Sequence, residues 1–432
     1  MNKKLFTLVS LLLLASMALS ACGPAVTEAP ATEAPATSAP ATEAPATEAP
    51  AEPAEATTIT MWHQWTGDYL TAIEQAFKDY EASHPNVKIE LSKPEDVTAA
   101  LQVAIPAGEG PDIIAWANDQ IGKNALAGNI VALDDYGVDQ ALLTGTYEPA
   151  AVQGVIWQDK IWALPETQEG IAFIYNQDLV TDEYLPTNPT DFDDILAKAQ
   201  KFYEDTGMPL FCNQGFKGAD AYHIGAVFFG FGVPSYVDDQ GNVTVDTPEA
   251  LEAMNWLLDV KPYLLQDADD EACRTAVKEG QAGGQWGGPW LLADFESAGV
   301  NYGVTPLGKP FVGIKVVMLT KNAVDRGNQD VALDIMKYYT SPEVQAKLAL
   351  VNKTIPAQTT ALADPEVAAL PSLVGFGEAL NSGVPMANTP FADAQWGPVG
   401  DAVGAIWNGS QTPEEALAAA QTAIEAKVAE MQ

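Results

Sequence analysis

Between residues 57 and 120, hydrophobic positions recur with two different periods, which predict strands and helices in turn. Thr58–Trp62 is a β-branched and aromatic run typical of a buried strand, and Val87–Leu91 alternates between apolar and polar residues. Apolar side chains recur at helical spacing over Tyr69–Tyr80, and the apolar run Asp112–Ala117 predicts a further strand. This order of strands and helices predicts an α/β body with largely parallel sheets.

Further along the chain, amphipathic runs predict helices, and several of them begin with a hydroxyl residue followed by proline. The hydroxyl can accept a hydrogen bond from a free N–H group of the first turn, and proline suits the first helical position. Thr247-Pro248, Ser341-Pro342 and Thr412-Pro413 fit this pattern. The predicted helices are Asp191–Asp205, Thr247–Leu258, Asp330–Tyr339, Pro342–Leu350 and Pro413–Ala429.

The first 56 residues differ from the rest and predict an export signal followed by a spacer. Two lysines precede an apolar stretch that is short for a membrane span, so residues 1–21 predict a signal peptide. The run Leu19-Ser20-Ala21-Cys22 is similar to the lipobox of bacterial lipoproteins, which implies cleavage before Cys22 and a lipid on its sulfur. An ordinary signal followed by an unmodified cysteine is the alternative. Residues 22–56 repeat Ala-Thr-Glu-Ala-Pro, which cannot bury enough apolar surface to fold and predicts an extended tether.

The charge of the chain narrows the choice of ligand. The 432 residues suffice for about two domains, and a composition of 47% hydrophobic and 18% charged residues is ordinary for a globular protein. However, 58 acidic residues against 21 basic ones give a net charge of −37. Nucleic acid is held by clustered lysine and arginine, so it is excluded as a partner, and a neutral ligand is favoured.

The residues that bind metals or form common catalytic motifs are few and scattered. The chain has three cysteines and three histidines, whereas a zinc site needs three or four closely organised ligands. Neither the Gly-x-Ser-x-Gly motif of hydrolases nor the phosphate-binding Gly-x-x-x-x-Gly-Lys-Ser/Thr motif occurs. We therefore expect no metal and no cofactor. Cys212 and Cys273 could form a disulfide in an oxidising compartment, although the sequence leaves their proximity open.

Several motifs follow one another in order along residues 57–432. They are Gly110–Asp119 (GPDIIAWAND), Ile161–Pro165 (IWALP), Phe173–Leu179 (FIYNQDL), Gly288–Trp290 (GPW), Val300–Val304 (VNYGV), Lys309–Gly313 (KPFVG) and Ala394–Trp396 (AQW). This ordered series resembles the extracellular solute-binding proteins of bacterial ABC importers, in the branch that binds maltose and maltodextrin. The opening run Met61–Gly67 (MWHQWTG) is more similar to relatives that bind trehalose, maltodextrin or arabinogalacto-oligosaccharides.

This resemblance implies a fold and a division into domains. The fold would be a periplasmic binding protein-like α/β fold of class II, in which two α/β lobes are joined by three hinge crossings and the ligand cleft lies between them. The crossings are expected near Thr167–Gly170, Val312–Lys315 and Val351–Pro356. The N-terminal lobe would combine residues 57–166 with 316–350, and the C-terminal lobe would combine 170–311 with 357–432.

The resemblance also assigns a ligand site, and the chemistry of sugars agrees with the residue types. Sugar rings present flat C–H faces, which aromatic rings can cover, and a rim of hydroxyls, which carboxylates and amides can bind. Trp116, Trp290 and Trp396 match the family's stacking aromatics. Asp119 and Glu169 match its carboxylates that accept hydrogen bonds from sugar hydroxyls.

At some site positions the chain departs from the family. Where the maltose-binding branch has an Asp-Lys pair after the first strand, this chain has the run WTGD, in which we predict Trp65 as a fourth stacking residue and Asp68 as a substitute acceptor. Gln120 replaces an arginine, and the glutamate–tyrosine pair of the second lobe has no clean match. Tyr222, beside His223, lies in that region and is a further candidate for ligand binding.

These expectations combine into a functional hypothesis. We expect a monomeric solute-binding component of an ABC importer, not an enzyme, that is lipid-anchored at the cell surface or in the periplasm. It would capture a neutral oligosaccharide by aromatic stacking and hinge closure and deliver it to the membrane permease. Maltose or maltodextrin is the first expectation, and trehalose or an arabinogalacto-oligosaccharide is the alternative. Two other classes stay open: an exported glycoside hydrolase, which would share the aromatics and paired carboxylates, and a sensing or structural surface lipoprotein without a permease.

Overall fold

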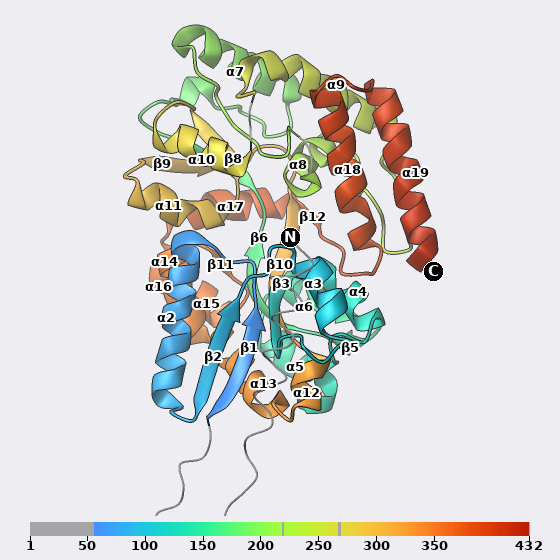
Figure 1. Cartoon of the computed structure of the whole chain (residues 1–432). Coiled ribbons are helices and arrows are strands. Elements are labelled where there is room, and N and C mark those ends of the chain that lie inside the picture. The colour runs from blue at the N-terminus through green and yellow to red at the C-terminus, as the bar shows by residue number, and fades with distance from the viewer. Residues whose placement is uncertain (1–55, 218–219, 267–268, 432) are drawn as a thin grey trace, which may run out of the picture. The chain divides into compact units, whose positions relative to one another are not determined.

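The computed structural model describes residues 56–217, 220–266 and 269–431, which contain strands arranged mainly in two sheets (Figure 1). The predicted signal peptide (1–21), Cys22 and the tether through residue 55 lie outside the described residues. The strands are β1 (Thr57–Trp62), β2 (Val87–Ser92), β3 (Ile113–Ala117), β4 (Ile156–Trp157), β5 (Lys160–Ile161), β6 (Leu164–Glu169), β7 (Ala172–Asn176), β8 (Gly284–Gly287), β9 (Tyr302–Thr305), β10 (Phe311–Leu319), β11 (Ile355–Pro356) and β12 (Val384–Pro385).

The large sheet has the strand order β11-β6-β10-β3-β1-β2, with β12 paired to β10, and the small sheet has the order β8-β7-β9. The three strands predicted between residues 57 and 120 are confirmed as β1, β2 and β3, and β1 pairs in parallel with both of the others. The prediction of largely parallel sheets is wrong elsewhere: β10 is antiparallel to β3 and β6, and the small sheet is entirely antiparallel. Strand β6 leads the chain from the large sheet to the small one and β10 leads it back, so these neighbours run in opposite directions.

The predicted helices are present, and their ends agree with the sequence to within three residues. The side chains of Thr247 and Ser341 cap α9 and α14 as predicted, and Thr412 accepts a hydrogen bond from the backbone N–H of Glu415. The helices are α2 (Gly67–Ser83), α3 (Val97–Ala104), α4 (Ile121–Leu126), α5 (Gln140–Thr146), α6 (Pro149–Gly154), α7 (Phe192–Thr206), α8 (Ala221–Phe231), α9 (Pro248–Val260), α10 (Asp270–Lys278), α11 (Leu292–Ser297), α12 (Lys321–Asp325), α13 (Gln329–Tyr339), α14 (Pro342–Asn352), α15 (Thr359–Leu362), α16 (Pro365–Ala368), α17 (Pro371–Asn381), α18 (Ala392–Trp407) and α19 (Pro413–Met431).

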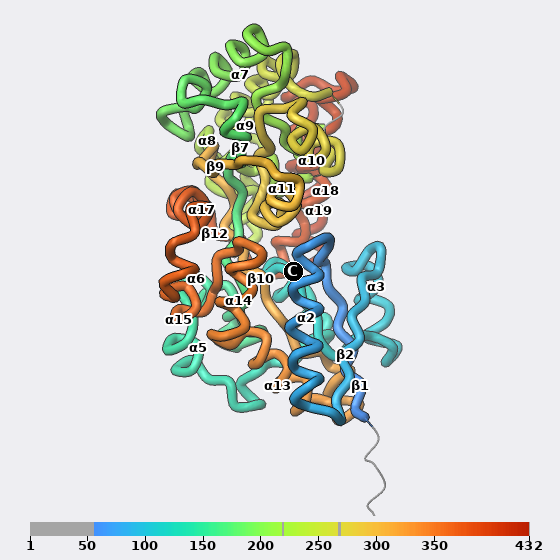
Figure 2. The backbone as a smooth tube through the Cα atoms, turned by 90° about the vertical axis from the view of Figure 1, so that its left-hand side faces the viewer, coloured from blue at the N-terminus to red at the C-terminus, as the bar shows by residue number. Residues whose placement is uncertain are grey.

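Each sheet has its own hydrophobic core. The large-sheet core is drawn from residues 59–164 and 314–357, and the small-sheet core from residues 171–311 and 386–428. Helices α2 and α13 lie with the large sheet, whereas α7, α9 and α10 lie with the small one (Figures 1 and 2). A third core, drawn from residues 172–295 and 349–379, packs α17 against the small sheet and extends to β11.

The segments predicted as hinge crossings contribute to β6, β10 and β11, which are adjacent in the large sheet. Ala357, which the sequence-based boundary assigns to the C-terminal lobe, is buried in the large-sheet core. The boundaries of the two lobes stay a prediction.

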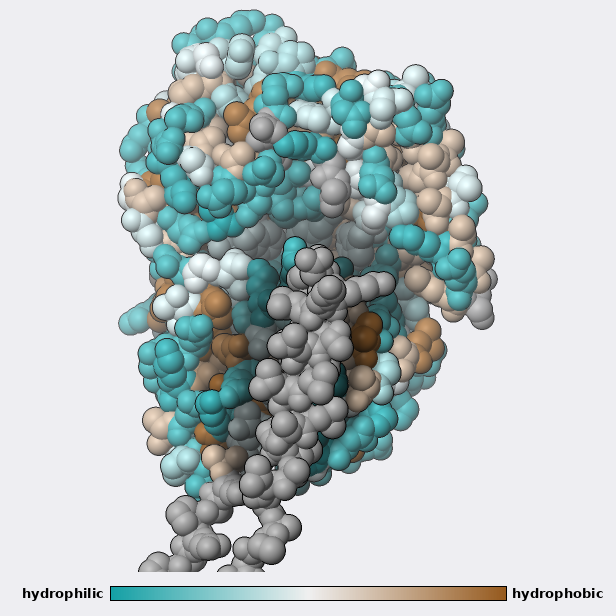
Figure 3. Space-filling view, viewed as in Figure 1, coloured by the Kyte–Doolittle hydropathy of each residue, from teal (hydrophilic) through white to brown (hydrophobic). Residues whose placement is uncertain are grey.

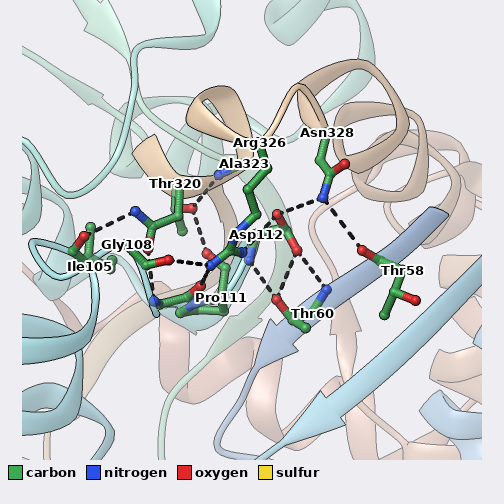
Figure 4. A network of polar contacts seen from close by, with 12 residues as sticks. Thr58, Thr60, Ile105, Gly108, Pro111, Asp112, Thr320, Ala323, Arg326 and Asn328 are labelled. Carbon is green, nitrogen blue, oxygen red and sulfur yellow. Dashed lines mark hydrogen bonds and ion pairs between the residues drawn. The ribbon is translucent and has the colours of Figure 1, made fainter. Parts of the chain in front are cut away.

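A buried polar network at the start of β3 gives a structural reason for the motif Gly110-Pro111-Asp112 (Figure 4). The Asp112 side chain is 1% exposed and accepts hydrogen bonds from the backbone N–H and hydroxyl of Thr60, both at 2.8 Å. Its other carboxylate oxygen lies 3.1 Å from Arg326 Nη1 and accepts a hydrogen bond of 3.1 Å from Asn328. Arg326 also donates to the backbone oxygen of Gly110. The network therefore ties β1, β3 and the segment between α12 and α13 together, and every oxygen of the buried carboxylate has a partner.

Cys212 and Cys273, whose pairing the sequence left open, form a disulfide with a Cα–Cα distance of 5.5 Å. The bond joins the segment before α8 to α10. On the face drawn in Figure 3, hydrophilic residues predominate and hydrophobic ones occur in small, separate patches, as the composition suggests. Within residues 56–217, 220–266 and 269–431, we find no helix with the length and hydrophobicity to span a membrane.

Candidate ligand-binding site

A cavity of about 470 Å³ collects most of the predicted ligand-binding residues. Its volume lies within the range of about 300–1,000 Å³ that small-molecule sites occupy. Seven of the eight predicted residues line it, namely Trp65, Trp116, Asp119, Glu169, Tyr222, Trp290 and Trp396. Asp68 does not: its side chain is exposed on α2 and accepts a hydrogen bond of 2.7 Å from the Ser297 hydroxyl.

The aromatic residues of the cavity come from the surroundings of both sheets. Trp116 lies near the end of β3 and packs against the large-sheet core, whereas Tyr222 and Trp396 pack against the small-sheet core. Trp290 packs against all three cores. Segments that are up to 331 residues apart in sequence (65 to 396) therefore contribute rings to one cavity, which suits a ligand with flat apolar faces.

Local packing holds these rings in place. A Cβ atom at Gly288 would lie only 2.1 Å from the Trp290 ring, so glycine is required for the close approach of the indole to the backbone. Tyr222 stacks on Phe311 with the two ring planes only 7° apart, and Trp396 packs at a steep angle against the same phenylalanine. The rings are therefore fixed before a ligand arrives, which lowers the entropy cost of binding.

Trp65 contributes less free surface than a stacking residue should. Its side chain is only 4% exposed, and its ring stacks on His63 at a centroid distance of 4.9 Å and packs against Tyr339 at 5.6 Å. Burial lowers the pKa of His63 to about 4, with a smaller contribution from the charge of Lys93, so His63 is a neutral ring at physiological pH. Trp65 is thus both part of the large-sheet core and part of the cavity wall.

Asp119 is a buried carboxylate with only half of its hydrogen-bonding capacity used. Its Oδ2 atom accepts bonds from Trp396 Nε1 at 2.9 Å and from Gln120 Nε2 at 3.1 Å, whereas Oδ1 has no partner among the described residues. Burial raises the pKa of Asp119 to about 6 because the charged form loses hydration; the two hydrogen bonds oppose this shift, and the nearby Asp393 adds to it. The free oxygen is suited to accept a hydrogen bond from a ligand hydroxyl.

Glu169 lies at the end of β6 and is also incompletely bonded. Its Oε1 atom accepts a hydrogen bond of 3.0 Å from the Thr167 hydroxyl, and Oε2 lies 3.6 Å from Lys315 Nζ, within ion-pair range but too far for a hydrogen bond. Next to it, Glu166 accepts hydrogen bonds from Tyr69 and Tyr339, and burial raises its pKa to about 7. Tyr69 also lines the cavity, so Glu166 lies directly behind its wall.

Several polar cavity residues lack a partner for a buried atom. Besides Asp119 and Glu169, these are Gln64, Gln120 and His223. Buried polar atoms in folded proteins are normally hydrogen-bonded, so their concentration around one cavity indicates a site whose partners come from a ligand or from water. Sequence reasoning did not select Gln64, Lys315 or Met386, which also line the cavity. Lys315 falls in a predicted crossing, and Gln64 adjoins Trp65. Their position beside predicted residues is the signal by which the sequence could have indicated that they line the cavity.

Polar contacts also join the two sheet regions around the cavity. Lys123, on α4, forms an ion pair of 2.7 Å with Asp393 on α18. On another side, Ser297 of α11 donates to Asp68 of α2. Together with the bond between Trp396 and Asp119, these contacts connect the two sheet regions on more than one side of the cavity.

Comparison with known proteins agrees with this geometry. Residues 75–374 match the family model described as bacterial extracellular solute-binding protein. The chain is 31% identical to a maltotriose-binding protein of Pyrococcus abyssi over 364 residues, which are 81% of this chain and 77% of that protein. It is 23% identical to a galactooligosaccharide-binding protein of Bacillus subtilis over 428 residues, 94% of each chain. The solved maltotriose-binding protein of Thermus thermophilus, bound with maltotriose, shares the fold with a TM-score of 0.75 and 22% identity, and the match covers 86% of this chain and all of that one.

Proposed function

The chain belongs to the bacterial extracellular solute-binding proteins, and on that premise we propose that it captures a neutral oligosaccharide in the cavity for an ABC permease. The family resemblance and the class II fold predicted from the sequence are confirmed. The observation that carries the proposal is the meeting of Trp116, Trp290 and Trp396 with incompletely bonded carboxylates in one cavity. The rings would cover sugar faces, and Asp119 and Glu169 would accept bonds from the hydroxyls.

We propose a maltodextrin as the ligand. The relative from Pyrococcus abyssi is a maltotriose-binding protein, and this supports an α-glucan of a few rings. The relative from Bacillus subtilis binds galactooligosaccharides, which makes such sugars the first alternative to test, together with trehalose and arabinogalacto-oligosaccharides. The lipid on Cys22 would hold the protein at the outer face of the membrane, and closure around the sugar would form the surface that docks on the permease.

Binding to purified protein tests the proposal. Isothermal titration with maltose, maltotriose, trehalose and galactotriose should give a micromolar or tighter Kd for at least one of them, with a change in tryptophan fluorescence. Trp290→Ala should weaken that binding more than tenfold, because it removes a ring that the three cores hold in place. Trp157→Phe is a matched control, since Trp157 packs against Trp162 and does not line the cavity.

Two results would contradict the proposal. The first is an absence of binding to every neutral oligosaccharide tested. The second is the release of new reducing ends when the protein is incubated with maltodextrins, which would indicate a glycoside hydrolase instead of a transport protein.

A further inference from the structure

We propose that His223 determines which oligosaccharide the cavity accepts, by hydrogen bonding one hydroxyl of the ring that lies near Trp290. This inference rests on the proposed function, because it requires a sugar in the cavity. It adds a residue that the family motifs do not assign, and it makes the presence of a hydroxyl at one ring position a condition for tight binding.

The position of His223 is the first support. It lies in the first turn of α8, lines the cavity and is only 6% exposed. Its ring stands nearly perpendicular to the rings of Trp290 and Tyr222, at centroid distances of 5.9 and 5.4 Å. A sugar that packs against Trp290 would therefore bring its hydroxyl rim close to the imidazole.

The contact with Asp220 fixes the chemistry of the ring. His223 Nδ1 lies 2.8 Å from Asp220 Oδ2, and the same oxygen accepts a hydrogen bond of 2.6 Å from Gln214. Although burial works to raise the pKa of Asp220, the charge and hydrogen bonds of His223 lower it well below its usual range, so the carboxylate stays ionised. An ionised carboxylate beside Nδ1 favours hydrogen on that atom, so Nε2 is the nitrogen that remains for a ligand: it accepts a hydrogen bond in the neutral ring and donates one in the imidazolium.

Neither ring nitrogen of His223 forms a hydrogen bond within the described residues, but Nδ1 has the ion-pair contact with Asp220, whereas Nε2 has no such contact. His223 Nε2 is buried and has no hydrogen-bond partner among the described residues. A buried ring nitrogen without a partner destabilises the empty cavity, and a ligand hydroxyl, which can donate or accept a hydrogen bond, would remove that cost. The partner must be supplied by the ligand or by water.

Helix capping does not account for the imidazole. Asp220 caps α8 by accepting a hydrogen bond of 3.1 Å from the backbone N–H of His223. Any residue other than proline at position 223 supplies the same N–H group, so the cap places no demand on the side chain. The buried ring in the cavity wall needs a separate explanation, and recognition of a hydroxyl provides one.

An unpaired nitrogen on His223 would make the cavity selective for sugars that carry the matching hydroxyl. A site built to hydrogen-bond a hydroxyl rejects an analogue without it strongly, because the buried group is then left unpaired. We therefore expect one monodeoxy derivative of the preferred oligosaccharide to bind much more weakly than the parent sugar.

The experiment measures the loss of affinity caused by removing one sugar hydroxyl, in the wild type and in a His223 variant. Maltotriose and its monodeoxy derivatives are titrated calorimetrically at pH 7.5 into the wild type and into His223→Phe, which keeps an aromatic ring and the capping N–H. The wild type should lose at least tenfold in affinity for one derivative. His223→Phe should bind maltotriose at least tenfold more weakly and show no further loss for that same derivative. His84→Phe is the matched control, because His84 is exposed at the end of α2, stacked on Tyr80, and should leave both values unchanged.

The outcomes separate this inference from the proposed function. If the wild type binds maltotriose and His223→Phe keeps the full affinity and every deoxy penalty, the inference is overturned while the proposed function stands. If the wild type binds no neutral oligosaccharide, the proposed function itself fails. His223→Gln guards against a loss of folding: recovery of part of the affinity supports recognition, whereas equal loss in both variants with a lowered Tm shows a structural role and overturns the inference.

Discussion

Asp112 and Asp119 lie at opposite ends of strand β3, and both are almost fully buried, at 1% and 6% exposure, yet their surroundings differ. At Asp112, a backbone N–H, a hydroxyl, a guanidinium and an amide surround both carboxylate oxygens. At Asp119, two donors share one oxygen, the other has none, and no lysine or arginine of the described residues lies within ion-pair distance.

This difference distinguishes a structural carboxylate from a binding one. A buried charge whose capacity is filled stabilises the fold through its partners, and it has nothing left to offer a ligand. A buried charge with a free oxygen makes the empty protein less stable, and it can recover that free energy when a ligand arrives. The position within the fold explains the contrast, since Asp112 lies beneath the α12–α13 segment and Asp119 lies at the cavity.

The largest effect should come from removing the cation at Asp112. Arg326→Ala leaves a buried carboxylate without its counter-charge, so the free energy of unfolding should fall by about 3–5 kcal/mol in urea denaturation at pH 7. Lys321→Ala is the matched control, because Lys321 forms an exposed ion pair with Asp325 within the same helix, α12, and its loss should cost less than about 1 kcal/mol. Equal losses in the two variants would contradict the structural role assigned to Asp112.

The next largest effect is the pH dependence of stability that the Asp119 carboxylate causes. The pKa of Asp119 is raised to about 6 in the folded protein, so its favourable contribution to stability is present below about pH 4 and is lost as pH rises to about 6. Asp119→Asn removes this dependence, and its stability relative to the wild type should increase by on the order of 3 kcal/mol between pH 4 and pH 7. Urea unfolding of both proteins without ligand, at each pH, measures the difference between their free energies of unfolding. Glu166, whose pKa is raised to about 7, titrates in both proteins, so its contribution cancels in this difference. A difference that does not vary with pH would show that Asp119 is not destabilised by its charge.

The same substitution should have the opposite effect on binding. Asp119→Asn replaces a charged acceptor by a neutral one, so the affinity for maltotriose at pH 7.5 should fall about ten- to a hundredfold, which corresponds to about 1.5–3 kcal/mol. Below pH 6 the wild type should lose affinity too, because protonation has a similar effect on the acceptor. Arg326→Ala, where it is folded, should keep its Kd within about twofold. An unchanged Kd in Asp119→Asn would remove Asp119 from the site.

The smallest effect tests whether the Asp112 network tolerates the loss of one of its several hydrogen-bond donors. Thr60→Val removes the hydroxyl that donates to Asp112 but keeps the backbone N–H that donates to the same oxygen. We expect a loss of about 1 kcal/mol in the free energy of unfolding, measured by urea denaturation at pH 7. A loss as large as that of Arg326→Ala would show that the network fails as a unit, and the contrast with Asp119 would then depend on the number of partners more than on the cation.

The sequence by itself determined the elements near β3 and seven of the residues that line the cavity. The strands β1, β2 and β3, the helices with hydroxyl caps, and seven of the eight predicted site residues were identified from local periodicity, capping and motif resemblance. Periodicity and capping depend on residues a few positions apart, and the free energies behind them, hydrophobic burial on one face and hydrogen bonds at helix ends, are set within each segment. The site residues came from the motif resemblance instead.

Only the tertiary structure decided the features that join distant segments. Arg326 reaches Asp112 across 214 residues, and Trp396 reaches Asp119 across 277. Four other features also depend on contacts between distant segments. They are the antiparallel course of β10, the disulfide between Cys212 and Cys273, the position of Asp68 outside the cavity and the unpartnered Nε2 of His223. A carboxylate looks the same in a sequence whether its oxygens are filled or free, because burial and partners are properties of the packed chain.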